Sequence, residues 1–158
     1  PFDVLRNIAY ITRYILLFSG IYCDNMPATR IQKQLAFKYV LHTLIDEDVD
    51  SPISIVFRHQ RIDQISDWVA LKREDIEGWT YPRDDGTDAT LETHRVSRIM
   101  LVPRYYYYHL LIRYRHIADE EWVYITDDQF QECRGPIWQV EIDAALEANH
   151  LTQPPFSS

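Results

Sequence analysis

Apolar residues recur every three or four positions along most of this chain, and this spacing places side chains on one face of an α-helix. Near the start the pattern comprises Val4, Ile8, Ile11, Tyr14, Ile15 and Phe18. It predicts a helix from about residue 3 to 18. A second pattern, RIQKQLAFKYVLHTLI, follows Pro27 and Thr29. One stripe comprises Ile31, Leu35, Tyr39 and His42, and Val40, Leu41 and Leu44 widen it. We therefore expect an all-α fold that begins with a helical hairpin.

A short acidic stretch, DEDVD, separates this hairpin from the rest of the chain. Its aspartates at 46, 48 and 50 alternate as calcium ligands do, but an EF-hand loop needs Gly at its sixth position and Glu at its twelfth. Ser51 and Phe57 occupy those positions. The stretch instead favours a solvated linker that ends with Ser51 as N-cap and Pro52 as the first helical residue. It is the expected boundary between residues 1–50 and a compact bundle over 51–118.

Helical patterns continue after the linker. Apolar spacing predicts two short helices between residues 52 and 71, a loop over 81–90, and a helix from Leu91 that restarts after Pro103. Thr126 and Gln129 form a capping box, which predicts a helix to about Cys133. Residues 137–150 favour a last helix, although 137–142 alternate enough to form a strand. Residues 119–158 are expected to form an acidic C-terminal segment and tail.

Charge is distributed unevenly along the sequence. The net charge of −8 should repel nucleic acid and anionic membranes from the molecule as a whole. Residues 92–118 nevertheless contain five basic residues and one acid, whereas residues 119–158 contain nine acids and only Arg134. The two segments could complement each other within one fold. They could also attract each other between copies arranged head to tail.

The segment LKREDIEGW resembles the Leu-x-x-Glu-Asp-Leu element of sterile alpha motif (SAM) domains, with Leu71, Glu74, Asp75 and Ile76 in the matching places. THRVSRIM then resembles the helix of that family with a Gly-His-Arg-x-x-Ile-like element, through His94, Arg95, Arg98 and Ile99. The family's Gly is replaced by Thr93, and the loop over 80–90 is longer. The resemblance covers about residues 51–116 and implies a SAM-like helical interaction bundle.

A longer stretch, about residues 51–134, is similar in pattern to Gag-like proteins of algal copia-type retroelements. A Glu-Asp-Ile element precedes a loop and a helix, and a Thr-x-Asp-Asp-Phe-like cap comes later. Here that cap is Thr126 to Phe130, with one extra residue. This similarity implies a self-associating or scaffold role.

No catalytic pattern is evident. Glu74 and Asp75 are adjacent and point in different directions on a helix, so they make a poor acid–base pair, and the first turn of a short helix suits them better. The six histidines lack HExxH or close His–Cys spacing, and no phosphate-binding glycine motif or nucleophile elbow occurs. We expect a non-enzymatic chain with no catalytic residue, no cofactor and no metal site.

The segment RYYYYHLLIRYRH, residues 104–116, is the best candidate for nucleic-acid contact, because tyrosines stack on bases and arginines bind phosphates. The same tyrosines sit at helical spacing, which favours an aromatic core or protein interface. The acidic net charge also argues against nucleic acid.

The cysteines and an apolar stretch near the start of the chain bear on compartment and membrane contact. Cys23 and Cys133 are far apart and form no CxxC motif, which favours free thiols in a reducing, intracellular compartment, and a single long-range disulfide is the alternative. The apolar stretch from Ile8 to Tyr22 contains Arg13 and is too short for a confident membrane span. Residues 4–18 could still lie against a membrane surface.

We therefore expect a protein-interaction or scaffold subunit of a larger assembly, which binds a protein partner or itself. The predicted contact residues are Trp68, Trp79, Arg95, Arg98, Tyr105 and Tyr108. Two alternatives stay open. One is a Gag-like protein associated with nucleic acid, and the other is an accessory subunit of an organellar membrane complex.

Overall fold

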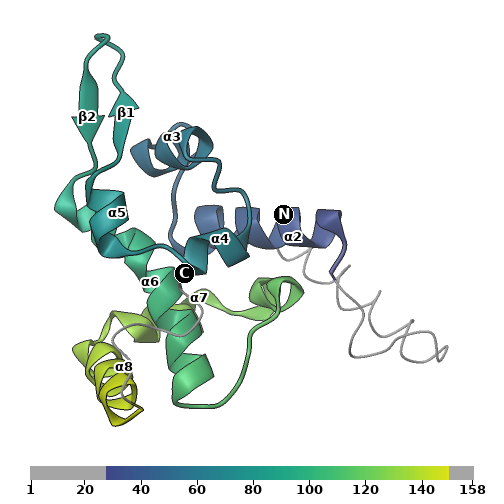
Figure 1. The fold of residues 1–158 in the computed structure, drawn as a ribbon. Coiled ribbons are helices and arrows are strands. Elements are labelled where there is room, and N and C mark those ends of the chain that lie inside the picture. Colours follow the sequence, from purple (N-terminus) through teal and green to yellow (C-terminus); the bar gives the residue numbers. More distant parts are fainter. Residues whose placement is uncertain (1–27, 150–158) are drawn as a thin grey trace, which may run out of the picture.

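A computed structural model describes residues 28–149, and these residues are mainly α-helical (Figure 1). The all-α prediction is therefore confirmed as a mainly helical fold. The helix expected over residues 3–18 lies outside the described residues. Within residues 28–149, no helix combines the length and apolar character that a bilayer span requires.

The first described helix forms as its sequence predicts. Thr29 caps α2 (Arg30–Tyr39) through a reciprocal capping box with Gln32, and the chain continues without a break into a π-helical turn, η1 (Val40–Leu44). The predicted apolar stripe is wrong at Ile31, which is exposed, and is confirmed further along the chain, where the buried face lies. That face comprises Ala36, Tyr39, Val40, Leu41 and Leu44.

Three short helices follow the acidic linker. Ser51 accepts a hydrogen bond from the Ser54 amide and caps α3 (Pro52–His59), with Pro52 in its first turn as expected. The chain then forms α4 (Ile65–Val69) and α5 (Arg73–Glu77). Glu74 and Asp75 lie in the first turn of α5, where the helix dipole favours acids.

The loop predicted over residues 81–90 is wrong in part. Strands β1 (Thr80–Pro82) and β2 (Asp88–Thr90) pair antiparallel, with Tyr81 opposite Ala89. Gly86 supplies the positive φ of 84° that the connecting turn requires. The hairpin projects from the helical body (Figure 1).

The central helix is α6 (Thr93–Leu111), which runs through Pro103 without interruption. The restart expected after this proline does not occur. A proline removes the N–H that would bind the carbonyl four residues earlier, here Ile99. The indole Nε1 of Trp68 donates to that carbonyl over 3.0 Å instead, so the missing helical bond is replaced from α4.

The acidic C-terminal segment packs first against α2 and η1, and then against α6. It contains the 3-10 turn η2 (Asp119–Tyr124), α7 (Asp127–Gln131), the 3-10 turn η3 (Glu132–Arg134) and α8 (Pro136–Ala148). The capping box of Thr126 and Gln129 is confirmed. Residues 137–142 are helical, which settles the choice between helix and strand.

One buried cluster joins these elements. It takes side chains from α2, α3, α4 and α5, from most of the inward face of α6, and from the segment between Ile117 and Ile142. Residues on both sides of the boundaries predicted at 51 and 119 contribute to it. The helix α6 packs against α4, α5, η3 and α8 and therefore positions the surfaces on both ends of the molecule.

Candidate interaction surfaces

The two arginines predicted to contact a neighbour bind within the chain. Glu47 is only 4% exposed, and its carboxylate lies 2.5 Å from Arg98 Nη1 and 3.6 Å from Arg95 Nη1. The closer contact is an ion pair outside hydrogen-bond geometry. Arg98 also donates to the carbonyls of Ile45 and Asp46. Because both guanidinium groups are committed to this turn, their first role is to hold the end of η1 against α6.

The two predicted tryptophan contacts belong to the core rather than the open surface. Trp68 is fully buried, and its ring packs edge-on against Phe57 at 4.7 Å between ring centroids. Trp79 is half-buried and packs against the same core. Trp68 is therefore inaccessible to a partner in this structure.

The predicted tyrosines form part of an aromatic cluster between α6 and α8. Tyr108 stacks on Trp138 with 3.9 Å between ring centroids, and Tyr105 lies 5.6 Å from the same indole. Arg113 lies over the outer face of Tyr108. Tyr105 is buried, whereas Tyr108 is half-buried, so the cluster fixes α8 on α6 and exposes only its edge.

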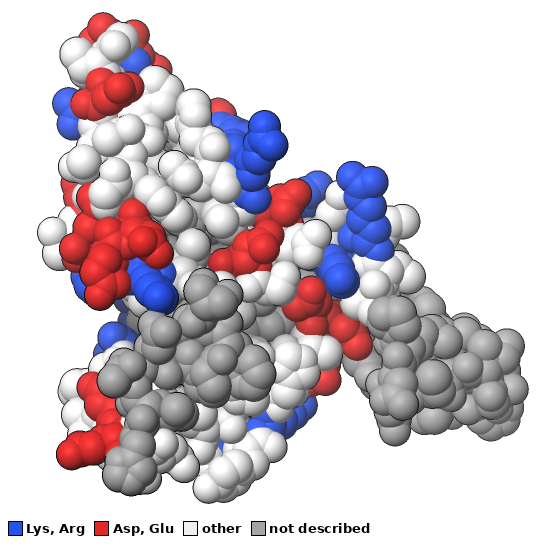
Figure 2. Space-filling view, viewed as in Figure 1, with Lys and Arg blue, Asp and Glu red and all other residues white. Residues whose placement is uncertain are grey.

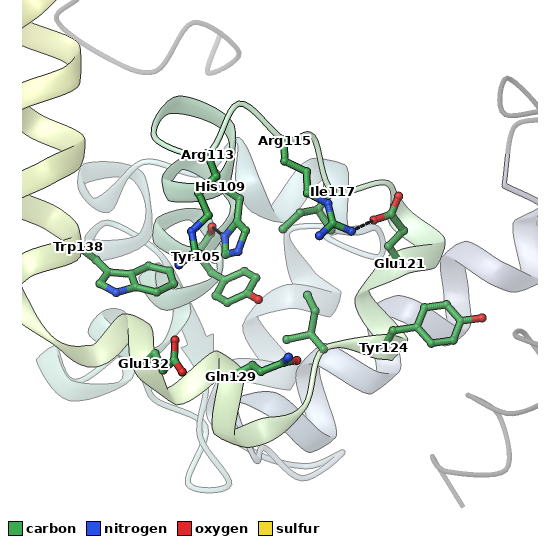
Figure 3. A pocket seen from close by; sticks show the side chains of 11 residues that line it. Tyr105, His109, Arg113, Arg115, Ile117, Glu121, Tyr124, Gln129, Glu132 and Trp138 are labelled. Carbon is green, nitrogen blue, oxygen red and sulfur yellow. Dashed lines mark hydrogen bonds and ion pairs between the residues drawn. The ribbon is translucent and has the colours of Figure 1, made fainter.

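A polar cavity of about 600 Å³ opens beside this cluster (Figure 3). Side chains from α6, the following loop, η2 and α7 surround it, with the Tyr105 ring and His109 on one side and Gln129 on the other. Arg115 reaches its edge and is paired with Glu121 at 3.1 Å. The cavity thus contains both charges, with Glu121 and Glu132 opposing Arg113 and Arg115.

His109 is the titratable group with the clearest setting in this cavity. Its Nδ1 lies 2.9 Å from the Tyr105 carbonyl, so the Nδ1–H tautomer donates to that oxygen. Burial lowers the pKa of His109 below its usual value, and the neighbouring charges of Arg113 and Arg115 act in the same direction. The imidazole is therefore neutral near pH 7.

Neither the cavity nor its surroundings assembles a recognisable reaction centre. The described residues contain no group of three or more His, Cys, Asp or Glu side chains placed to hold a metal ion. Cys133 is buried, and burial raises the pKa of its thiol to about 12, so it stays protonated and unreactive in the folded chain. Cys23 lies outside the described residues.

A second hollow, of about 560 Å³, lies between α2, α3 and the loop that follows α3. Its apolar lining comprises Phe37, Leu41, Val49, Phe57 and Ile62. Three exposed basic side chains stand on its rim, Lys38, Arg58 and Arg61. We call this hollow and its rim the basic groove. Asp63 is the acid in its lining.

Arg61 is held on the rim by an unusual backbone conformation. Its amide bonds to the Arg58 carbonyl and the Ile62 amide bonds to the Phe57 carbonyl, which is the Schellman arrangement that ends a helix. The residue at this position needs a left-handed conformation, and glycine normally occupies it. Here it is Arg61, with φ of 56°. An arginine in this left-handed conformation is less stable than a glycine would be.

The outer face of α8 carries the other unpartnered apolar surface. Ile137 and Val140 are 62% and 63% exposed, and Ala144 is exposed on the same face. These positions follow helical spacing of three and then four residues, opposite the buried Trp138 and Ile142. We call Ile137, Val140 and Ala144 the α8 ridge. The helix has no basic residue, and its acids Glu141, Asp143 and Glu147 lie on either side of the ridge.

The two surfaces differ in charge and lie far apart. Figure 2 shows basic side chains over α2 and α3 and acidic ones over α8. Within residues 28–149, neither the basic side chains on the groove rim nor the acids of α8 form ion pairs. The charges of the rim cations and of the exposed Asp143 and Glu147 are therefore available to groups outside this part of the chain, whereas one carboxylate oxygen of Glu141 is buried.

Neither surface was predicted from the sequence. The basic groove combines residues from three segments, so no local pattern reveals it. The α8 ridge did leave a signal, because its apolar positions add a second stripe to the one formed by Trp138 and Ile142. The core of the chain buries only one of these two stripes, so the other is left exposed.

Comparisons of the chain with protein-family models, with curated proteins and with solved structures find no match. Its role must be inferred from its own side chains.

Proposed function

We propose that this chain is a non-enzymatic structural subunit that assembles with protein neighbours, and that the basic groove receives the neighbour. The observation that carries this proposal is the combination of an apolar hollow with Lys38, Arg58 and Arg61 on its rim. Burial of apolar side chains would supply affinity, and the three cations would direct an acidic partner into the hollow.

The lining suggests the shape of the partner. Phe57 and Leu41 form a buried floor between two helices, and Val49 stands exposed at the edge. A groove of this kind accepts the apolar face of an amphipathic helix, with its charged flanks against the rim. The similarity to Gag-like proteins also implies a self-associating or scaffold role, and the resemblance to SAM domains implies a protein-interaction role.

The proposal is tested by measuring the mass of the purified full chain by light scattering coupled to size-exclusion chromatography. We expect the mass to rise with concentration at low salt and to fall at high salt, because the rim charges are exposed and screened. Arg58→Glu with Arg61→Glu should weaken assembly. If the wild type assembles and this double variant assembles to the same extent, the groove is not the docking site.

A second candidate function has a specific observation in its favour. Tyr114 is 90% exposed between Arg113 and Arg115, also exposed, at the end of α6. An exposed aromatic ring between two cations suits stacking on a base with phosphate contacts on either side. Binding of a labelled single-stranded RNA at low salt, lost in Tyr114→Ala, would support this role. The absence of any gel shift for the wild type would remove it.

A further inference from the structure

We infer that the occupant of the basic groove is α8 of a second copy of this chain. The inference rests on the proposed function and names its partner. It follows from two surfaces on one molecule, the basic groove and the α8 ridge, that complement each other in shape and charge.

The apolar parts match first. Large hydrophobic side chains that are exposed within residues 28–149 are few, and three of the five border these two surfaces. Ile137 and Val140 project from a helix, whereas Val49 edges a hollow. A ridge of branched aliphatic side chains is the counterpart that an aromatic and aliphatic groove accepts.

The charges match in the same sense. The ridge is flanked by Glu141 on one side and by Asp143 and Glu147 on the other, and the groove by three cations. Glu147 also lies in the last turn of α8 (Pro136–Ala148), where the negative end of the helix dipole makes an acid unfavourable. Cations from the groove of a neighbour would offset both the carboxylates and the dipole.

The arrangement in space requires two molecules. The helices α2 and α3 lie at one end of the structure and α8 at the other, with α6 between them (Figure 1). A chain cannot place its own ridge in its own groove without unfolding the aromatic cluster of Tyr108 and Trp138. The contact is therefore heterologous, and each copy uses its groove for one neighbour and its ridge for another.

The test uses charge exchange in the full chain. The ridge variant carries Asp143→Lys with Glu147→Lys, and the groove variant carries Arg58→Glu with Arg61→Glu. All four side chains are exposed, so both variants should fold, which circular dichroism verifies. Each variant alone should associate at least about tenfold more weakly than the wild type, because like charges then face each other.

Mixing the two variants gives the decisive result. In the mixture, the cationic groove meets an acidic ridge, and the acidic groove meets a cationic ridge. We expect the mass measured by light scattering to return to that of the wild type. A control variant, Asp84→Lys with Asp88→Lys in the hairpin, makes the same change of net charge as the ridge variant, away from both surfaces, and should assemble normally.

The remaining outcomes separate the two proposals. A wild type that stays monomeric at every concentration overturns the inference, and the occupant is then another protein or residues 1–27 of the same chain. If only the groove variant is impaired, the groove binds something other than α8, and the proposed function survives alone. If neither variant is impaired, both proposals fail.

Discussion

At the scale of single residues, the clearest sign of function is the strained backbone of Arg61. The side chain of this residue forms no ion pair within residues 28–149 that would offset the strain. Arg61 occupies a left-handed position that suits glycine, and its side chain stands on the rim of the basic groove. Strained backbone positions are found where function requires a particular side chain. At this position an arginine therefore lowers the stability of the fold but supplies a cation for binding.

Arg61→Gly should separate the two effects. We expect the free energy of unfolding to rise by about 1 kcal/mol, because glycine adopts the left-handed conformation without steric cost. Self-association should weaken in the same variant, because one rim cation is lost. Chemical denaturation and light scattering measure the two quantities. Arg58→Ala is the matched control, since it removes a rim charge from a helical position and should weaken association without any gain in stability.

His109 should make the folded chain sensitive to mild acid. Its pKa is lowered by burial, so between the unfolded value of about 6.5 and the folded value only the unfolded chain binds a proton. The contribution to stability is thus complete above about pH 6.5 and is lost as the pH falls. We expect the free energy of unfolding to decline between about pH 7.5 and 5.5, by less than about 1.4 kcal/mol per pH unit from this group.

His109→Gln should show a smaller decline over the same interval. Asp67 and Asp119 have pKa values raised by burial and contribute with the opposite sign, but they are present in both chains and cancel in the comparison. If the free energy of unfolding fell equally with pH in the wild type and in His109→Gln, His109 would not remain neutral in the folded chain.

At the scale of elements, helix positions followed from local signals, and the exceptions have tertiary causes. The caps predicted at Ser51 and Thr126 are contained in a few adjacent residues and were confirmed, and the helix expected after Thr29 begins there. The break expected at Pro103 depended on a freed carbonyl, and only the fold shows that Trp68 satisfies it. The β1–β2 hairpin was read as a loop because its strands are only three residues each.

The indole of Trp68 replaces the hydrogen bond that Pro103 cannot donate to the Ile99 carbonyl, and a double-mutant cycle can measure this replacement. Trp68→Phe should destabilise the wild type partly by leaving the Ile99 carbonyl without its donor. In a Pro103→Ala chain the new amide of residue 103 can bind that carbonyl. The cost of Trp68→Phe should therefore be smaller by about 1 kcal/mol in that background.

Trp122 provides the control for this cycle. It is equally buried, but its Nε1 has no hydrogen-bond partner among the described residues. The cost of Trp122→Phe should be the same with proline or alanine at position 103. Equal costs for Trp68→Phe in the two backgrounds would contradict the proposed replacement.

At the scale of the whole molecule, the sequence predicted opposite charges and aromatic residues but not where they would meet. Arg95 and Arg98 were expected on a partner surface, yet the fold brings Glu47 between them from about fifty residues away. The basic groove depends in the same way on the fold, which places residues of α2 and α3 around one hollow. Charge blocks can be counted in a sequence, whereas the pairing of one residue with another depends on tertiary packing.

A groove and a ridge at opposite ends of one chain lead to a prediction about the form of the assembly. Heterologous contacts that do not close produce open chains, so the wild-type mass should rise continuously with concentration. The variant Ile137→Asp with Val140→Asp keeps its groove but offers no ridge, so it should add to one end of a chain and stop growth there. A small fraction of this variant should lower the mean mass of the wild type.

A mixture of two variants that each keep only one of the two surfaces should form an assembly of defined size. When the chain lacking the ridge is mixed with the Arg58→Glu, Arg61→Glu chain, only one intact groove and one intact ridge can pair. The mixture should reach twice the 18.9 kDa mass of a single chain and no more. A mixture that grows beyond this size would mean that copies meet through a surface other than the basic groove and the α8 ridge, because every other route is closed.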